Sequence, residues 1–201
     1  MQKKLSTLLS TSILLVGLSG CVVGNQMGHS GNDVYSTFGD IGVIDGERAG
    51  DLENNSGNIT IGRNAKVKAV DITNGNIDIG EHSEAYSLKT TNGNIDVGKN
   101  VVITRSVETV NGQINIQQGA KIGANLMASN GDVSLAKNSL VQGDVIFGDT
   151  FLSSQADKMS SLSIAEGATI EGQIHLYKKV IVVLPDSINP DKIVKHYQDK
   201  K

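Results

Sequence analysis

The chain of 201 residues carries 18 Lys and Arg against 21 Asp and Glu, and its formal net charge is −3. These charges are scattered, which excludes a concentrated basic surface, so we expect no nucleic-acid partner. With 23 Gly, no Trp, three Phe and four Tyr, the chain lacks the rings of an ordinary globular core and has to build one from Ile, Val, Leu and Ala. The single Cys excludes an internal disulfide.

Residues 1–20 are predicted to be a signal peptide. Lys3 and Lys4 give a positively charged start, and residues 5–18 form a mostly apolar stretch that is too short to span a bilayer comfortably. The stretch ends in the sequence LSGC, residues 18–21.

The LSGC motif resembles the lipobox of bacterial lipoproteins. The resemblance implies that Cys21 is lipidated on its thiol, that it becomes the mature N-terminus, and that the protein is anchored in a membrane and can be labelled with palmitate. Val22 rather than Asp follows the cysteine, which by the usual enterobacterial sorting rule implies the outer membrane, with the periplasmic or surface face left open. The alternative is an ordinary secretory signal followed by an unrelated cysteine.

Residues 21–37 are predicted to be the lipidated cysteine followed by a flexible tether. After Cys21 the sequence VVGNQMGHSGNDVYST is polar and rich in Gly, without hydrophobic periodicity. His29 in this segment is expected to be solvated.

A repeat occupies residues 38–178. Glycines recur every 18 or 19 residues, and each is followed by an apolar-polar-apolar triplet such as Ile77 to Ile79. Two further apolar clusters complete each period, so each holds three short strands and three corners. This pattern predicts an all-β fold, a single-stranded three-sided β-solenoid of about seven coils. Its interior should be narrow and should accommodate a bulky ring badly.

In four successive coils, one corner carries an Asn-Gly pair. We expect Gly there because it accepts a positive φ angle, and we expect the preceding Asn side chains to hydrogen-bond as a ladder along the corner. A hairpin is the alternative for one such pair, but the constant spacing disfavours it. The ladder residues are Asn74, Asn92, Asn111 and Asn130.

Two solenoid families share parts of this pattern. Residues 61–66 and 79–84 fit the hexapeptide repeat of left-handed β-helices, whereas residues 162–176, with GATIEGQI inside them, resemble bactofilins. The second resemblance implies a polymer-forming, right-handed β-helix. Bactofilins are usually cytoplasmic, so the export signal departs from that family. We favour the right-handed form because right-handed crossovers dominate parallel β connections.

We expect no catalytic residue, cofactor or metal site in this sequence. Asp78 and Asp96 should stack one coil apart, which could serve acid–base catalysis or cation binding, but we favour a solvated strand face, because carboxylates that repeat with the structural period are poor evidence for a site. His82 is the one plausible counterpart of an acyltransferase histidine. His175 and His196 are not expected to pair with another histidine at metal-ligand spacing.

An interruption separates Phe147 from Leu162. The sequence GDTFLSSQADKMSS is about ten residues longer than the corner requires, and extra length in a solenoid projects as a loop. Its apolar residues, Phe151, Leu152 and Met159, form a possible interaction surface, or else fold back over the side of the solenoid.

Residues 179–201 are predicted to form a C-terminal strand and a helical cap. The run VIVVL at 180–184 is strand-like, and residues 191–200 place Ile193, Val194 and Tyr197 at helical spacing. Such a cap should cover the last coil, so we expect a monomer or small closed oligomer rather than a filament.

These features favour a non-enzymatic cell-envelope lipoprotein that acts as a rigid scaffold or adhesin-like interaction protein. Its expected partners are the membrane and an envelope protein or polysaccharide. The alternative is a carbohydrate-active or acyltransferase enzyme on a β-helix scaffold.

Overall fold

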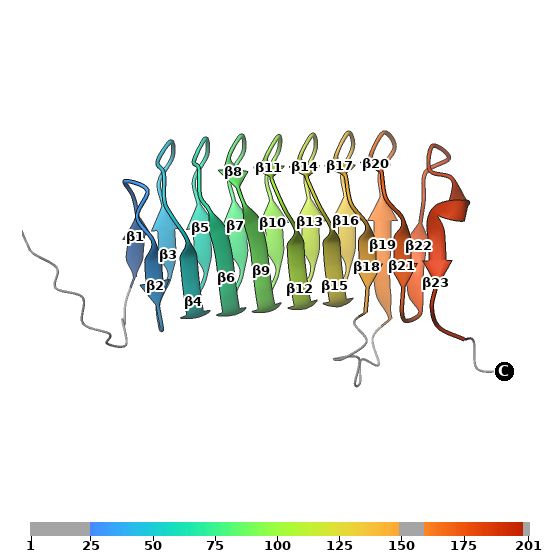
Figure 1. The fold of residues 1–201 in the computed structure, drawn as a ribbon, viewed down its shortest axis with the longest axis horizontal. Helices are drawn as coiled ribbons and strands as arrows, with labels where there is room; N and C mark the ends of the chain where they lie inside the picture. The colour runs from blue at the N-terminus through green and yellow to red at the C-terminus, as the bar shows by residue number, and fades with distance from the viewer. Residues whose placement is uncertain (1–24, 149–158, 199–201) are drawn as a thin grey trace, which may run out of the picture.

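The computed structural model describes residues 25–148 and 159–198, which form a parallel β-solenoid of about eight turns (Figure 1). This confirms the all-β solenoid, with about one turn more than expected. The predicted signal peptide and Cys21 lie outside the described residues. In the described part of the chain, no helix has the length and apolar character needed to cross a membrane.

The first side of the solenoid is a sheet of nine parallel strands, each paired with the strand one turn before and one turn after. In order along the rod they are β1 (Gln26–Gly28), β3 (Ile41–Val43), β5 (Ile59–Ile61), β7 (Ile77–Ile79), β10 (Ile95–Val97), β13 (Ile114–Ile116), β16 (Val133–Leu135), β19 (Ser160–Ile164) and β22 (Val180–Val183).

The second side is another sheet of nine parallel strands. They are β2 (Val34–Ser36), β4 (Leu52–Ser56), β6 (Ala69–Asn74), β9 (Ser87–Asn92), β12 (Val107–Asn111), β15 (Leu126–Asn130), β18 (Val145–Phe147), β21 (Ile174–Leu176) and β23 (Ile193–Lys195).

The third side has five two-residue strands, and isolated bridges from Arg48 to Lys66 and from Lys66 to Glu84 extend it toward the N-terminus. The strands are β8 (Glu84–Ala85), β11 (Val102–Ile103), β14 (Lys121–Ile122), β17 (Leu140–Val141) and β20 (Thr169–Ile170).

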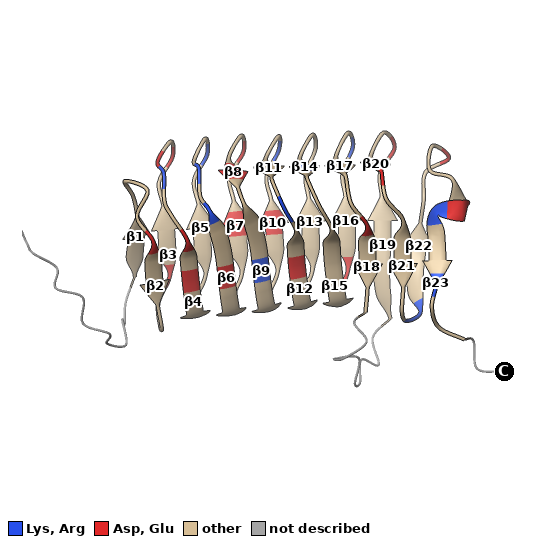
Figure 2. Ribbon diagram, viewed as in Figure 1, with Lys and Arg blue, Asp and Glu red and all other residues tan. Residues whose placement is uncertain are grey.

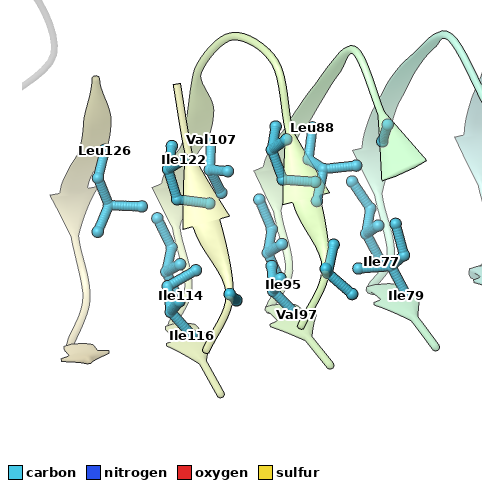
Figure 3. Packing of buried hydrophobic residues seen from close by; sticks show 14 of the residues in the cluster. Ile77, Ile79, Leu88, Ile95, Val97, Val107, Ile114, Ile116, Ile122 and Leu126 are labelled. Atoms are coloured by element: carbon cyan, nitrogen blue, oxygen red, sulfur yellow. The ribbon is translucent and has the colours of Figure 1, made fainter. Parts of the chain in front are cut away.

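The core consists of aligned columns of β-branched and aliphatic side chains. On the first sheet Ile77 pairs with Ile95 and Ile95 with Ile114, and all three are fully buried (Figure 3). Burying each such side chain stabilises the fold by about 1.5–3 kcal/mol. One aromatic ring does enter the core, contrary to expectation: Phe147 is 0% exposed, and its partner one turn earlier is the small Ala128, which leaves room for it.

The Asn-Gly corner needs Gly mainly because successive coils approach each other closely there. A Cβ added to Gly93 would collide with the carbonyl oxygen of Gly75, and one added to Gly112 would collide with that of Gly93. Only the earlier glycines of this corner have a positive φ, for example 152° at Gly75. The expected reason, a positive φ, is therefore wrong for the later coils.

Left-handed backbone occurs instead at the corner that follows the first sheet. In successive coils this position is occupied by Asn, His or Gly, residue types that tolerate the left-handed conformation. Their φ angles run from 56° to 79°, at Gly46, Asn64, His82, Asn100, Gly119, Asn138 and Gly167.

The change from 18 to 19 residues per coil occurs at the third corner. Two residues separate the buried Ala85 from the buried Leu88, whereas three separate Ile103 from Val107. Thr104 is thus the first residue in this widened corner.

The solenoid begins earlier than predicted, because β1 and β2 lie within the segment expected to be a flexible tether. β1 pairs with β3 and β2 with β4. Gly28 packs closely, since a Cβ there would lie 3.0 Å from side-chain atoms of Ala49 and Val43. The glycine that suggested flexibility instead allows tight stacking.

The predicted C-terminal helix is also wrong. Residues 190–192 form a single 3-10 turn, η1 (Pro190–Lys192), after which β23 pairs with β21. The β-branched Ile193 and Val194 favour a strand once a paired edge is available. The predicted strand at 180–184 is present as β22, which pairs with β19.

Candidate functional site

The four ladder asparagines form a chain of side-chain hydrogen bonds along one corner. Asn92 Nδ2 donates to Asn74 Oδ1 at 2.9 Å, Asn111 Nδ2 to Asn92 Oδ1 at 2.8 Å, and Asn130 Nδ2 to Asn111 Oδ1 at 3.0 Å. Lys178 Nζ ends the chain by donating to Asn130 Oδ1 at 3.2 Å. Burial lowers the pKa of Lys178, and nearby Asp132 acts against that shift. These amides are therefore occupied in holding the coils together.

A second ladder runs beside the first and joins side-chain oxygens to backbone amides. The N–H of Asn76 donates to Asn58 Oδ1 at 3.0 Å, that of Asn94 to Asn76 Oδ1 at 2.8 Å, and that of Gln113 to Asn94 Oδ1 at 2.9 Å. The outward asparagines of this column therefore accept hydrogen bonds from the backbone of the next coil.

The stacked carboxylates lie where the sequence predicted them. Asp78 on β7 pairs in register with Asp96 on β10, and Asn115 Nδ2 donates to Asp96 Oδ1 at 2.7 Å. Partial burial raises the pKa of Asp78, and the charge of Asp96 raises it further. The Asp78 carboxyl therefore holds its proton more readily, while the neighbouring Asp96 carboxylate accepts a hydrogen bond from the Asn115 amide.

His82 occupies a structural corner position. Its φ angle of 62° belongs to the left-handed column, and its backbone N–H donates to the carbonyl of Lys99 at 2.9 Å. The conformation of the corner thus accounts for a residue type that tolerates a positive φ at this position.

The predicted interaction loop is described only at its C-terminal end. Phe151 and Leu152 lie outside the described residues. Met159 is 52% exposed and lines a hollow of about 280 Å³ beside Asn130, Gly131 and Asp132 at the Asn-Gly corner.

The outer face of the second sheet changes character along the rod. Its first half carries charges on β4, β6, β9 and β12 (Figure 2). The next two positions of the row are the apolar Met127 and Ile146. A hollow of about 270 Å³ lies there, lined by Glu108, Met127, Ile146 and Tyr177. From β2 to β23 the row is Tyr35, Glu53, Asp71, Lys89, Glu108, Met127, Ile146, His175 and Val194.

A larger hollow of about 390 Å³ lies at the third corner, just before the coils widen. Val67, Ala69 and Ala85 contribute apolar atoms, and the half-exposed Tyr86 and the widened-corner residue Thr104 also line it. Two charged side chains at its rim form an ion pair with each other: Lys66 Nζ lies 2.6 Å from Glu84 Oε1.

Two histidines meet near the C-terminal end, which contradicts the expectation that they would not pair. His175 Nδ1 lies 3.0 Å from His196 Nε2. The His196 ring stacks on Tyr177, with centroids 4.3 Å apart and planes inclined by 9°. His175 Nε2 lies 3.8 Å from Asp144 Oδ2.

Strand register explains this cluster. His175 and Tyr177 project from the same face of one chain segment, and His175 pairs with Val194, which places His196 opposite Tyr177 and diagonal to His175. The 21-residue separation of the histidines differs from the coil length, so periodicity alone did not reveal it. The predicted helix over 191–200 concealed the strand that brings them together.

In the described ranges, no group of three or more His, Cys, Asp and Glu side chains is arranged to hold a metal ion. No protein-family model matches this chain, and neither a curated protein nor a solved structure matches it.

Proposed function

We propose that this protein is a non-enzymatic envelope lipoprotein, a rigid β-solenoid anchored through Cys21 that acts as a scaffold or adhesin-like interaction protein. The observation that carries the proposal is the continuity of the two nine-stranded sheets along the described rod. At about 4.8 Å per layer, nine layers span roughly 40 Å. Such a rod holds its outward side chains at fixed spacing, which suits repeated contacts with a partner.

The polar columns support the scaffold role over a catalytic one. The amides of Asn74, Asn92 and Asn111 hydrogen-bond to one another, and Asn76 and Asn94 bond to backbone. Side chains committed in this way stabilise the coil stack. The LSGC motif at residues 18–21 supports the membrane anchor, with the outer membrane as the proposed location.

The proposed contact region is the surface around Met159. This exposed side chain lies beside a hollow, at the point where the chain leaves its regular period. A rigid scaffold commonly presents binding residues on such an insertion. The proposed partner is an envelope protein or polysaccharide.

A photo-crosslinking experiment in intact cells tests this proposal. A photoreactive residue replaces Met159 in one variant and Thr60, on the outer face of β5, in a matched control. We expect a discrete crosslinked product from position 159 alone, and only when Cys21 is present. Equal products from both positions, or none from either, would count against this contact region.

One observation favours the alternative, a carbohydrate-active enzyme. The raised pKa of Asp78 beside Asp96 is the kind of asymmetry that glycoside hydrolysis uses. Saccharide hydrolysis that is lost in both Asp78→Asn and Asp96→Asn would establish this alternative in place of the scaffold.

A further inference from the structure

We propose that His175 and His196 form a two-histidine binding site for a borderline divalent transition-metal cation, with Zn²⁺ and Cu²⁺ as the best-suited ions. This inference goes beyond the scaffold role and does not depend on it. It starts from the approach of His175 Nδ1 to His196 Nε2, the two ring nitrogens that face each other at 3.0 Å.

The distance between these nitrogens fits a shared cation. Two nitrogens that each lie about 2.1 Å from one metal are about 3.0–3.4 Å apart when the angle at the metal is about 90–110°. The observed separation is at the short end of that range. The two ring planes are inclined by 30°, so binding requires the rings to turn until both lone pairs point at one ion. Imidazole is a preferred ligand of Zn²⁺ and Cu²⁺.

The surroundings orient both rings for this role. Tyr177 stacks on His196 and holds its plane, while Asp144 Oδ2 lies 3.8 Å from His175 Nε2. In the tautomer whose hydrogen is on Nε2, that hydrogen lies on the side of the ring near the Asp144 carboxylate and the lone pair of Nδ1 remains for a cation. A carboxylate behind a ligating histidine is the usual outer-shell arrangement in metal sites.

The exposure of the site suits an ion that keeps water ligands. The side chain of His175 is 22% exposed, and His196 is an exposed residue on the last coil. Two protein ligands leave the other coordination positions for water, or for a ligand from a partner molecule. The bound ion would link the turn that contains β21 to the final turn, which ends with β23.

Isothermal titration calorimetry of the purified protein with ZnCl2, repeated with CuSO4, tests the site. We expect saturable binding by the parent, and at least tenfold weaker binding by both His175→Gln and His196→Gln. Gln keeps a polar side chain of similar reach but offers no imidazole. His82→Asn is the matched control, because Asn tolerates the positive φ of that corner, and its affinity should equal that of the parent.

A second readout separates loss of the site from loss of the fold. Zn²⁺ that binds only the folded protein raises its Tm, so the parent and His82→Asn should be stabilised and both Gln variants should not. Circular dichroism without metal should be the same for all four proteins. Absence of saturable binding by the parent, or parent-like binding by either Gln variant, would overturn the proposal and leave the pair as a hydrogen bond only.

Discussion

At the scale of single residues, the glycines of the Asn-Gly corner are the least replaceable positions. A Cβ at Gly93 would overlap the backbone carbonyl of Gly75, and backbone cannot move aside as a flexible side chain can. The neighbouring asparagines stabilise the same corner through hydrogen bonds of 2.8–3.0 Å. Close approach and amide pairing thus act together at one corner of the coil.

We expect Gly93→Ala to lower the free energy of unfolding by more than about 2 kcal/mol, because the coils must separate locally. Gly46→Ala is the matched control: Gly46 has a φ of 78° and open space around its Cα, so the substitution costs only the conformational strain, about 1–2 kcal/mol. Urea unfolding measures both. A cost for Gly93→Ala no larger than that of the control would refute the close-approach argument.

The carboxyl of Asp78 gives stability a dependence on pH. Burial, and then the charge of Asp96, raise its pKa, so the folded state holds this proton more tightly than the unfolded chain, whose Asp pKa is about 3.9. The resulting stabilisation is present below that pH and is lost as pH rises through the raised folded pKa.

Asp78→Asn should therefore be more stable than the parent at pH 7, by less than about 1 kcal/mol because the group is partly solvated. The difference should shrink toward pH 3. Urea unfolding at pH 3, 5 and 7 measures it, with the exposed Asp71→Asn as the control. Parallel pH profiles for the parent and Asp78→Asn would contradict the assignment.

At the scale of strands and turns, hydrophobic alternation and period made the three-sided coil predictable. The inward residues of β7, β10 and β13 repeat strictly, and each lies over its equivalent one turn away. The ends of the solenoid were less predictable, because an end coil has a neighbour on one side only and its sequence need not keep the repeat.

The candidate sites likewise differ in how far the sequence predicts them. Asp78 and Asp96 follow from periodicity because they belong to the repeat. The contact between His175 and His196 does not, because it depends on where β23 pairs after an irregular turn. The helical spacing over residues 191–200 was misleading, because the β-branched Ile193 and Val194 form a strand where the edge of β21 is available for pairing.

The final turn is held by a lysine that covers the end of the third side. Lys192 Nζ donates to the carbonyls of Ile170, Glu171 and Gly172 at 2.7, 3.0 and 3.0 Å. These carbonyls lie at and just beyond β20, the last strand of that sheet. A charged donor to several backbone oxygens replaces the strand that would otherwise continue the sheet.

We expect Lys192→Met to cost about 1.5–3 kcal/mol, the usual range for a hydrogen bond to a charged group. Hydrogen exchange should accelerate at the amides of β23 in this variant. Lys195→Met, on an exposed position of β23, should leave exchange unchanged. If the two substitutions had the same effect, Lys192 would have no special role at the end of the rod.

At the scale of the whole molecule, open strand edges at the two ends of the described rod raise the question of polymerisation. Lys and Pro protect edge strands from further pairing. Pro185 follows β22, and Pro190 begins the 3-10 turn that carries Lys192. We therefore predict that residues 22–201 form a monomer or small closed oligomer. Light scattering and negative-stain microscopy measure this, and long fibres from the intact domain would contradict it.

The anchor determines whether this rod acts at a membrane. Fractionation of cells fed labelled palmitate, with the parent and Cys21→Ala compared side by side, tests the lipoprotein proposal most directly. The parent should carry the label and sediment with membranes, whereas Cys21→Ala should be unlabelled and recovered in the soluble fraction. A Cys21→Ala protein that stays membrane-bound and labelled would contradict the account of a lipid-anchored solenoid.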